Sequence, residues 1–543
     1  MFLFITGILF SLWLFFSSGI KQQPAALKTA RLSFAPFFIL LLLIPYSFFY
    51  TQINGLQPLG CLIIISAGAI IFNIILKKNT DKPALPSRLT VFILLIAYTI
   101  FFGAISVLRH LNYQNASSFD VALYSQIQWN NIHGHFFQSS ISGSNFVTHN
   151  SPFLILLSPF YAIYPHPEAL LILKTLFLSL SAIPFYLILK HYLHEKALFP
   201  LVLGYLFFPF IVGQNFNAPH ETCFLPPLLL FSFYFFLKNR FKSFLFFLLL
   251  SLSITEHMAL IAITYGLYAL YLKKEKRWVI TPILLGIVWG IFSIWIIYYF
   301  QKIYHTDPYP AWLIDNIKRR FLRAHSAVWS NLLWGIKTSN FGHWGNFCTI
   351  YPLLSPVMIL LPFFSLIALL GMPELLINLL ASLPLTYPTW HYTIVAACFL
   401  LIACADSIKK ISCSAFSLKL QLPPYKIQEL LSWLLCVCIL SHFFLWWDYT
   451  TIKKDPRYVK TMNAAIELVP KEASVSLTKH LVAYVSNRKD YFLCEEARKG
   501  EYIVLDKNET MNDCFKDISQ AGRYIQISSQ DGIKVYKSLS SAP

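Results

Sequence analysis

Charged residues are scarce in this chain. Aspartate, glutamate, lysine and arginine make up only 13% of its 543 residues, whereas hydrophobic residues make up 56%. A water-soluble domain needs far more polar surface than this composition supplies. The scarcity therefore argues against a soluble protein and indicates one that crosses a membrane many times.

Short motifs of several enzyme classes are also missing. The sequence contains no glycine-rich phosphate loop, no HExxH and no nucleophile elbow, so cytosolic ATP chemistry is unsupported. The ten cysteines have no spacing typical of a metal site. Cys398, Cys404, Cys436 and Cys438 lie in apolar runs and are expected to be buried thiols. We therefore predict no metal site and no cofactor, because nothing in the sequence supports a divalent metal.

Acidic residues are also few compared with basic ones. Lysine and arginine total 43 against 25 aspartate and glutamate, which gives a net charge of +18. These cations are dispersed over short loops and form no basic domain, so a nucleic-acid partner is not expected. Dispersed basic loops are typical of membrane proteins, in which they anchor the cytoplasmic ends of helices.

Long apolar runs dominate the rest of the chain. The run at 243–272 is interrupted by Thr255-Glu256-His257 and is divided into two spans, and 373–386 is a shorter span. Other runs long enough to cross a bilayer are at 1–20, 33–50, 59–76, 90–108, 168–189, 197–213, 222–237, 278–300, 352–371, 392–407 and 429–447. We predict an all-α polytopic membrane protein with about 14 transmembrane helices, residues 1–89 preceding a core at 90–447. The first run is expected to be a retained helix, with a signal peptide as the alternative.

Loop charges predict the orientation of these spans. Alternate loops are basic, as expected when basic loops stay in the cytoplasm. This pattern places the long loop 109–167, residues 214–221 and Glu256 on the extracytoplasmic side. Segment 304–351 falls on the same side although it is basic, and long loops follow the rule less strictly.

The segment 448–543 has the composition of a small soluble domain, and the orientation places it outside. ASVSL, KDYFL and EYIVL are typical of strands, TKHLVAYVSN and MNDCFKDISQ of helices, and 523–538 of a hairpin turning at Gln530-Asp531-Gly532. We predict a C-terminal α/β domain. In an extracytoplasmic domain Cys494 and Cys514 could form a disulfide.

The long outer loop begins with a polar helix. Ser117-Ser118 is a favourable helix start and places Asp120 in the first turn. Phe119, Leu123 and Ile127 then share one stripe, opposite Asp120, Tyr124, Gln128 and Asn131. The pattern predicts a helix in the membrane interface with its acid facing a polar cleft, although helix capping alone also explains Asp120. Segment 151–165 is short and bounded by prolines, which favours an interfacial or re-entrant segment.

Three other groups of polar residues are expected on the same side of the membrane. They are Asn217–Glu221, Glu256-His257 and Trp390-His391-Tyr392, each at the outer end of an apolar run. Ionisable side chains at such depth are costly and often functional. If the helix ends adjoin, these groups form one outward-facing polar cavity with Asp120. The alternative is that each group belongs to its own loop.

Several long strings resemble a bacterial membrane-protein family defined as a domain of unknown function. They are FDVALYSQIQWN, THNSPFLILLSPFYAIYPHPEALLILKTLFLSLSAIPFYLIL, APHETCFLPPLLLFSFYF, SITEHMALIAITYGLYAL, PLLSPVMILLPFFSLIALLGMPELLINLLAS, HYTIVAACFLLIA and VPKEASVSLTKHLVAYVSNRKDYFL, together spanning about residues 90–510. That family is similar in architecture to the GT-C glycosyltransferases, which include protein mannosyltransferases and lipid A aminoarabinose transferases.

The resemblance implies a glycosyltransferase in the bacterial inner (plasma) membrane that takes sugar from a polyprenyl-phosphate donor. GT-C enzymes carry a catalytic acid in the first large outer loop, and Asp120 occupies the matching loop. Val and Ala follow Asp120, so the acidic pair that supports a metal in stricter members is missing.

We therefore expect Asp120 to act as general base on an acceptor glycan, lipid or protein. The residues expected to bind the substrate or its lipid phosphate are Arg109, His149, His220, Glu221, Glu256, His391 and Tyr392. A transporter or lipid flippase with the same outward-facing cavity is the alternative, and a scaffold that presents the C-terminal domain is a weaker one.

Overall fold

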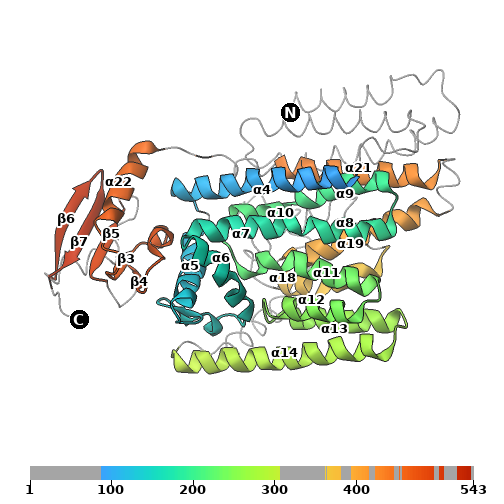
Figure 1. The fold of residues 1–543 in the computed structure, drawn as a ribbon, viewed down its shortest axis with the longest axis horizontal. Helices are drawn as coiled ribbons and strands as arrows, with labels where there is room; N and C mark the ends of the chain where they lie inside the picture. The colour runs from blue at the N-terminus through green and yellow to red at the C-terminus, as the bar shows by residue number, and fades with distance from the viewer. Residues whose placement is uncertain are drawn as a thin grey trace, which may run out of the picture.

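The computed structural model describes residues 87–115, 117–305, 361–362, 364–380, 393–414, 422–444, 452, 455–494, 500–506 and 523–539. The expected spans at 1–20, 33–50 and 59–76 lie outside these residues. The described part is mostly helical, with a small sheet near the C-terminus (Figure 1). That combination agrees with the predicted fold class.

Apolar helices lie side by side and form a bundle (Figure 1). Their bounds are α4 Ser87–Leu111, α7 Pro167–Leu180, α8 Ala182–Tyr192, α9 Glu195–Leu206, α10 Pro209–Val212, α11 Leu225–Leu237, α12 Phe241–Leu252, α13 Met258–Tyr271, α14 Lys276–Ile303, α18 Met372–Leu380, α19 Ile394–Ser412 and α21 Pro424–Phe444. Short 3-10 turns join some of them: η4 Gly213–Phe216, η5 Glu221–Phe224 and η6 Leu366–Leu370. The break between α12 and α13 falls at Thr255-Glu256-His257, where the sequence predicts it.

Three helices in the described residues are long and apolar enough to cross a bilayer, namely Arg88–Leu111, Pro167–Tyr192 and Lys276–Ile303. A fourth crossing results if Glu195–Leu206 and Pro209–Phe216, bent by 46°, count as one span. Helices α11, α12 and α13 are apolar but shorter. The expected total of about fourteen crossings stays a prediction.

Charge is distributed unevenly between the two ends of this bundle. The turns between α8 and α9, α11 and α12, and α13 and α14 lie at one end. They carry or adjoin Lys190, Lys196, Lys238, Arg240, Lys242, Lys273, Lys274, Lys276 and Arg277. At the other end, residues 112–166, 213–220 and 253–257 contain no lysine or arginine. Within the described residues, Asp120, Asn217–Glu221 and Glu256-His257, which were predicted to be functional, lie at this cation-poor end.

The cation-poor end is covered by the long loop. It contains α5 Ser118–Ile132, the short strands β1 Gln138–Ser139 and β2 Gly143–Ser144, η2 Asn145–Val147, η3 Pro152–Leu157 and α6 Ser158–Ile163. Strands β1 and β2 pair antiparallel. The segment Pro152–Ile163 is apolar but too short to span, as the sequence predicts.

Helix α5 differs from the predicted interfacial helix. Ile127, expected to face lipid, is fully buried, and Val121 and Ala122 are also buried. The reason is that α5 is covered from two directions, by α6 of the same loop and by η10 (Val482–Val485) of the C-terminal segment. Ile127 therefore packs inside the protein and does not face lipid, whereas Phe119 and Leu123 of the same predicted stripe are half-buried.

The C-terminal segment forms a five-stranded sheet with order β4-β3-β5-β7-β6. Its elements are α22 Pro456–Glu467, β3 Val475–Leu477, η10, β4 Tyr491–Leu493, β5 Tyr502–Leu505, β6 Tyr524–Gln530 and β7 Ile533–Ser538. The predicted strands and hairpin are confirmed, and Asp531 and Gly532 both have positive φ at its turn. Residues 478–487 form turns and a 3-10 helix where an α-helix was predicted, because η10 packs against α5.

The sequence predicts a disulfide in the C-terminal segment, between Cys494 and Cys514. Cys494 is buried and disulfide-bonded. Cys514, the expected partner, lies outside the described residues, as does the predicted helix 511–520. The pairing of these two cysteines stays a prediction.

A shared core joins the sheet to the bundle. Val121 and Ala122 of α5 and Ala218 of the turn before η5 belong to the same hydrophobic cluster as Val475 and Val482. Gln126 of α5 adds polar contacts, because its amide nitrogen donates to the carbonyls of Arg488 (3.2 Å) and Lys489 (2.7 Å). The sheet thus holds α5 against the end of the bundle (Figure 1).

A buried lysine holds the turn between η4 and η5. The side chain of Lys174 on α7 is fully buried and donates to the backbone carbonyls of Asn215 (3.3 Å) and Asn217 (2.5 Å). Residues 213–217 end the bent helix, so these carbonyls have left the regular helical pattern. Lys174 supplies a donor to both carbonyls, and the Ser106 hydroxyl also donates to the carbonyl of Asn215.

We predict that Gln126→Leu loosens the C-terminal sheet from the bundle. The substitution leaves the buried carbonyl of Arg488 and the partly buried carbonyl of Lys489 without this donor, which costs about 1–3 kcal/mol. Thermal unfolding in detergent and limited trypsin cleavage of the C-terminal segment measure the effect. Gln138→Leu, at an exposed position of the same loop, is the matched control. Equal melting temperatures and cleavage rates in the two variants would contradict the assignment.

Lys174→Met is expected to lower the melting temperature in detergent. It keeps the apolar stem but removes a donor from the buried carbonyl of Asn215, which still accepts from the Ser106 hydroxyl, and from the partly buried carbonyl of Asn217, at a cost of about 1–3 kcal/mol. Lys190→Met is the control, because the Lys190 ammonium makes surface contacts, with Glu195 at 3.8 Å and with the ring of Tyr186, whose centre is 5.8 Å away. A Lys174→Met protein as stable as this control would show that the turn between η4 and η5 does not depend on the lysine.

Candidate functional site

Asp120 lies in the first turn of α5, as the sequence predicts. Ser117 is the N-cap residue, and its hydroxyl oxygen accepts a hydrogen bond from the backbone N–H of Asp120 at 3.4 Å. The same hydroxyl donates to Oδ2 of Asp120. Within the described residues Oδ1 has no protein partner, and the side chain is half-buried. Asp120 therefore caps its helix and still presents one carboxylate oxygen.

The surroundings of Asp120 influence its charge in opposite directions. Burial raises the pKa of Asp120, while the Ser117 hydroxyl, the Lys479 ammonium and the His149 imidazole lower it. The net shift is upward from the ordinary value. Lys479 comes from the turn after β3, and its Nζ lies 5.2 Å from the ring centre of Phe119. The C-terminal sheet thus delivers a cation beside the predicted base.

His220 and Glu221 stand at the start of η5. The Glu221 side chain is fully buried, and its Oε2 accepts a hydrogen bond from the Tyr124 hydroxyl of α5. Nδ1 of His220 lies 3.0 Å from the same oxygen. The ring of His220 also packs edge-on against Tyr124, with ring centres 5.2 Å apart. Helix α5 and the turn before α11 are therefore joined by a polar contact.

A second ion pair lies next to the first. Nδ1 of His149, in the loop after η2, is 3.1 Å from Oε1 of Glu256, in the break between α12 and α13. Burial alone disfavours both charges. The opposite charges outweigh burial, so the pKa of His149 is raised and the pKa of Glu256 is lowered. The backbone N–H of Asn150 also donates to Oε2 of Glu256 at 3.3 Å.

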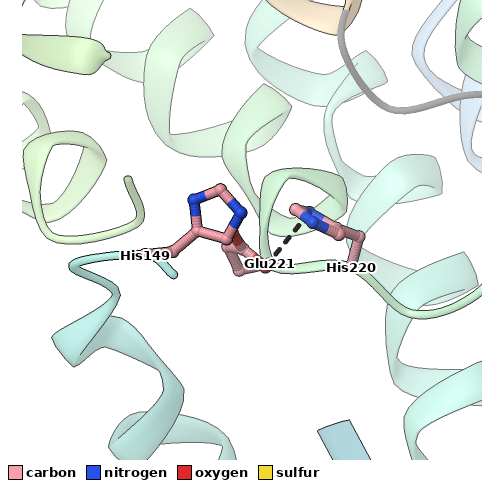
Figure 2. A group of neighbouring side chains, drawn as sticks. All are labelled: His149, His220 and Glu221. Atoms are coloured by element: carbon pink, nitrogen blue, oxygen red, sulfur yellow. Dashed lines mark ion pairs between the residues drawn. The ribbon is translucent and has the colours of Figure 1, made fainter. Parts of the chain in front are cut away.

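These two pairs meet in one cluster. The rings of His149 and His220 have centres 5.7 Å apart. Figure 2 shows the His149 ring turned toward Glu221 and His220. One ligand atom from each of these three residues lies within 4.8 Å of the other two. Four of the residues predicted from the sequence, His149, His220, Glu221 and Glu256, are thus brought together beside Asp120.

The cluster is more enclosed than the expected outward-facing cavity. The exposed fractions of the side chains are 31% for His149, 17% for Glu256, 10% for His220 and 0% for Glu221. The polar groups therefore form a buried site that reaches solvent at His149 and Asp120. A cavity of about 590 Å³ lies elsewhere, between Asn112 and α22.

The remaining predicted residues are placed differently. Arg109 lies in the last turn of α4, and its guanidinium donates to the carbonyl of Gln114 at 3.0 Å. This contact is local to the end of its own helix. His391 and Tyr392 lie outside the described residues. His133 and His135 of the long loop are exposed.

Sequence reasoning missed two contributors. Tyr124 was predicted to share the polar stripe of Asp120, but its contact with Glu221 depends on how α5 packs on the turn before α11. Lys479 was not predicted at all, because the docking of the C-terminal segment on α5 leaves no pattern in the sequence.

Chemically, the site combines a half-buried carboxylate with a buried group of imidazoles and acids. The free oxygen of Asp120 can accept a proton from a hydroxyl group that approaches from solvent. Imidazolium and ammonium groups at His149 and Lys479 can stabilise an anion. The arrangement is therefore suited to acid–base chemistry on a substrate with a negative group.

Comparison with known proteins gives a family and a distant structural likeness. No curated protein matches the chain. The structure of ArnT from Cupriavidus metallidurans bound to undecaprenyl phosphate is similar at 10% identity and a TM-score of 0.47, covering 83% of this chain and 99% of that chain. Its apo state is similar at 9% identity and a TM-score of 0.45, covering 83% and 98%. Such values do not establish a shared activity. The family model described as predicted membrane protein (DUF2079) matches residues 109–535, so this chain belongs to that membrane-protein family.

Proposed function

We propose that the chain is an integral membrane glycosyltransferase that uses a polyprenyl-phosphate-linked sugar at the extracytoplasmic face. The observation that carries the proposal is the convergence of His149, His220, Glu221 and Glu256 beside Asp120 at one end of an apolar bundle. A site at the end of membrane helices suits a substrate whose lipid tail stays in the bilayer. The donor class follows from the resemblance in architecture to GT-C enzymes.

The side of the membrane follows from the charge distribution. The three basic turns lie at the end opposite the site, and basic loops are retained in the cytoplasm. The site and the C-terminal sheet, which packs on α5, then face outward. For a bacterial protein this orientation supports a location of both at the outer surface of the inner membrane.

The proposed reaction is a single displacement. Oδ1 of Asp120 takes the proton of the acceptor hydroxyl while the oxygen of that hydroxyl forms a bond to the anomeric carbon of the sugar. The bond between this carbon and the phosphate oxygen breaks, and the polyprenyl phosphate leaves with the electron pair. The sugar is therefore transferred with inversion. The cationic groups near Asp120 neutralise the departing phosphate.

Other predicted residues keep proposed roles around this step. Glu221 and Glu256 organise the imidazoles and hold sugar hydroxyls. Arg109 is proposed to bind the lipid phosphate from the end of α4, and His391 and Tyr392 are proposed to bind substrate. The acceptor is a glycan, a lipid or a protein.

A transporter is less well supported by the positions of buried charges. Transport requires polar groups that continue through the bundle. Lys174 hydrogen-bonds to residues 215 and 217, and Glu374 lies 3.7 Å from His257. Both contacts are at the end that carries the site. Among the described residues, Lys174, Glu221 and Glu374 are buried at the end that carries the site, which favours an enzyme with a surface site, while Lys426 is buried at the start of α21.

Asp120→Asn is expected to lower the rate of sugar transfer by about 10²-fold to 10⁴-fold, the usual contribution of a positioned base. The substitution keeps the shape and an oxygen that accepts from Ser117, so α5 should remain capped. The measurement is release of sugar from a polyprenyl-phosphate donor by the purified full chain in detergent. Asp490→Asn, at an exposed position of the C-terminal sheet, is the control. Full activity of Asp120→Asn would refute the role of this carboxylate.

Lys479→Gln is expected to move the acidic limb of the pH–rate profile upward. The base acts when ionised, and the Lys479 ammonium lowers the pKa of Asp120 by stabilising the anion. Removing the cation raises that pKa, so higher pH is needed for the same rate. Because Lys479 is exposed and screened, a shift of about a few tenths of a pH unit is expected. Lys471→Gln, also exposed in the C-terminal segment, should leave the limb unchanged, and a downward shift in Lys479→Gln would contradict the assignment.

A further inference from the structure

We infer that His149, His220 and Glu221 form a binding site for one divalent transition-metal ion of the zinc class. An imidazole nitrogen from each histidine and a carboxylate oxygen of Glu221 lie within 4.8 Å of one another. The three residues come from two loops at the same end of the bundle (Figure 2). No short motif connects them, which is why the sequence predicts no metal.

The first independent sign of a ligand is an unsatisfied atom. Glu221 is fully buried, and its Oε2 interacts with Tyr124 and His220. Its other oxygen, Oε1, is buried, and no group among the described residues forms a hydrogen bond to it. A buried carboxylate oxygen with no donor is costly, and a cation would satisfy it.

The second sign is the orientation of His149. Its Nδ1 faces Oε1 of Glu256 at 3.1 Å, and the ring is turned toward Glu221 and His220 (Figure 2). Nε2 is therefore the nitrogen directed into the cluster. Histidines that bind metal commonly donate their other N–H to a carboxylate, which fixes the ring and raises its basicity. Glu256 is placed to be that carboxylate.

The donor set selects the class of ion. Two imidazoles and one carboxylate suit zinc and similar transition metals better than magnesium or calcium, which prefer oxygen ligands. Zinc bonds of about 2.0–2.1 Å place tetrahedral ligands about 3.4 Å apart, so binding draws these side chains together by about 1 Å. Three protein ligands leave a fourth position open, as in catalytic zinc sites.

The consequence for sugar transfer depends on the proposed function. The open position would lie at the side of His149 that reaches solvent, beside Asp120. An ion there can bind a phosphate oxygen of the donor and stabilise the charge that develops as the phosphate leaves. The site would then separate the two tasks, with Asp120 acting on the acceptor and the ion acting on the leaving group.

The test measures metal binding by the full chain, purified in detergent, stripped with a chelator and freed of any affinity tag. Cobalt(II) and zinc(II) are titrated alone, with the cobalt absorption spectrum and metal content as readouts. We expect about one ion per chain and the spectrum of a four- or five-coordinate site with nitrogen ligands. His149→Gln and Glu221→Gln should lose this spectrum. His135→Gln, which changes an exposed histidine of the same loop, should keep it.

Glu256→Gln distinguishes a supporting residue from a ligand. It should retain one ion per chain with about 10-fold to 100-fold weaker affinity, the usual effect of removing an outer carboxylate. Wild-type protein that binds no ion, or ligand variants that bind as tightly as His135→Gln, would overturn the inference. If the ligand variants do not fold, a wild-type cobalt spectrum typical of six oxygen ligands rejects the site.

Metal binding and sugar transfer can fail separately. Because the titration contains no donor or acceptor, a chain that binds one ion but transfers no sugar refutes the proposed function alone. A chain that transfers sugar at full rate while demonstrably free of metal refutes the role of the ion and leaves Asp120 in place.

Discussion

A fully buried carboxylate at the end of an apolar helical bundle is the constraint on which the site depends. Taking the Glu221 charge out of water is expensive unless donors or cations surround it. Tyr124, His220 and the pair of His149 with Glu256 supply that environment, and each comes from a different part of the chain. The buried negative charge of Glu221 must be stabilised by these groups. This requirement determines how α5, the turn before α11 and the break after α12 meet.

The elements around the cluster are arranged to keep it in place. Lys174 donates a hydrogen bond to the carbonyl of Asn217. Asn217 follows the end of the bent helix and lies four residues before Glu221. Asn150 binds Glu256 through its backbone N–H, and α5 is fixed between the bundle and the C-terminal sheet. Preorganisation of this kind lets charged groups act on a substrate without first rearranging.

Much of the fold could be predicted from the sequence, and less of the site. Hydrophobic runs predict α4, α7, α11 and α14 because burial in a membrane requires continuous apolar stretches, and the break at Glu256 interrupts such a run. Alternation and the Asp531-Gly532 pair predict the hairpin. The environment of α5 was not predictable, because its second cover comes from η10, more than 300 residues away. The ligating geometry of His149 and Glu221 also depends on packing, which residue spacing does not encode.

The contact between η10 and α5 also has a consequence for how the chain is divided. Val121, Ala122 and Ala218 share a hydrophobic cluster with the C-terminal strands, so cutting before Pro456 would leave these side chains facing water. The soluble-looking end of the protein is therefore a structural part of its membrane core, and the two are best regarded as a single cooperative unit. Any shortened version intended for crystallisation or expression must keep that end to retain an intact α5.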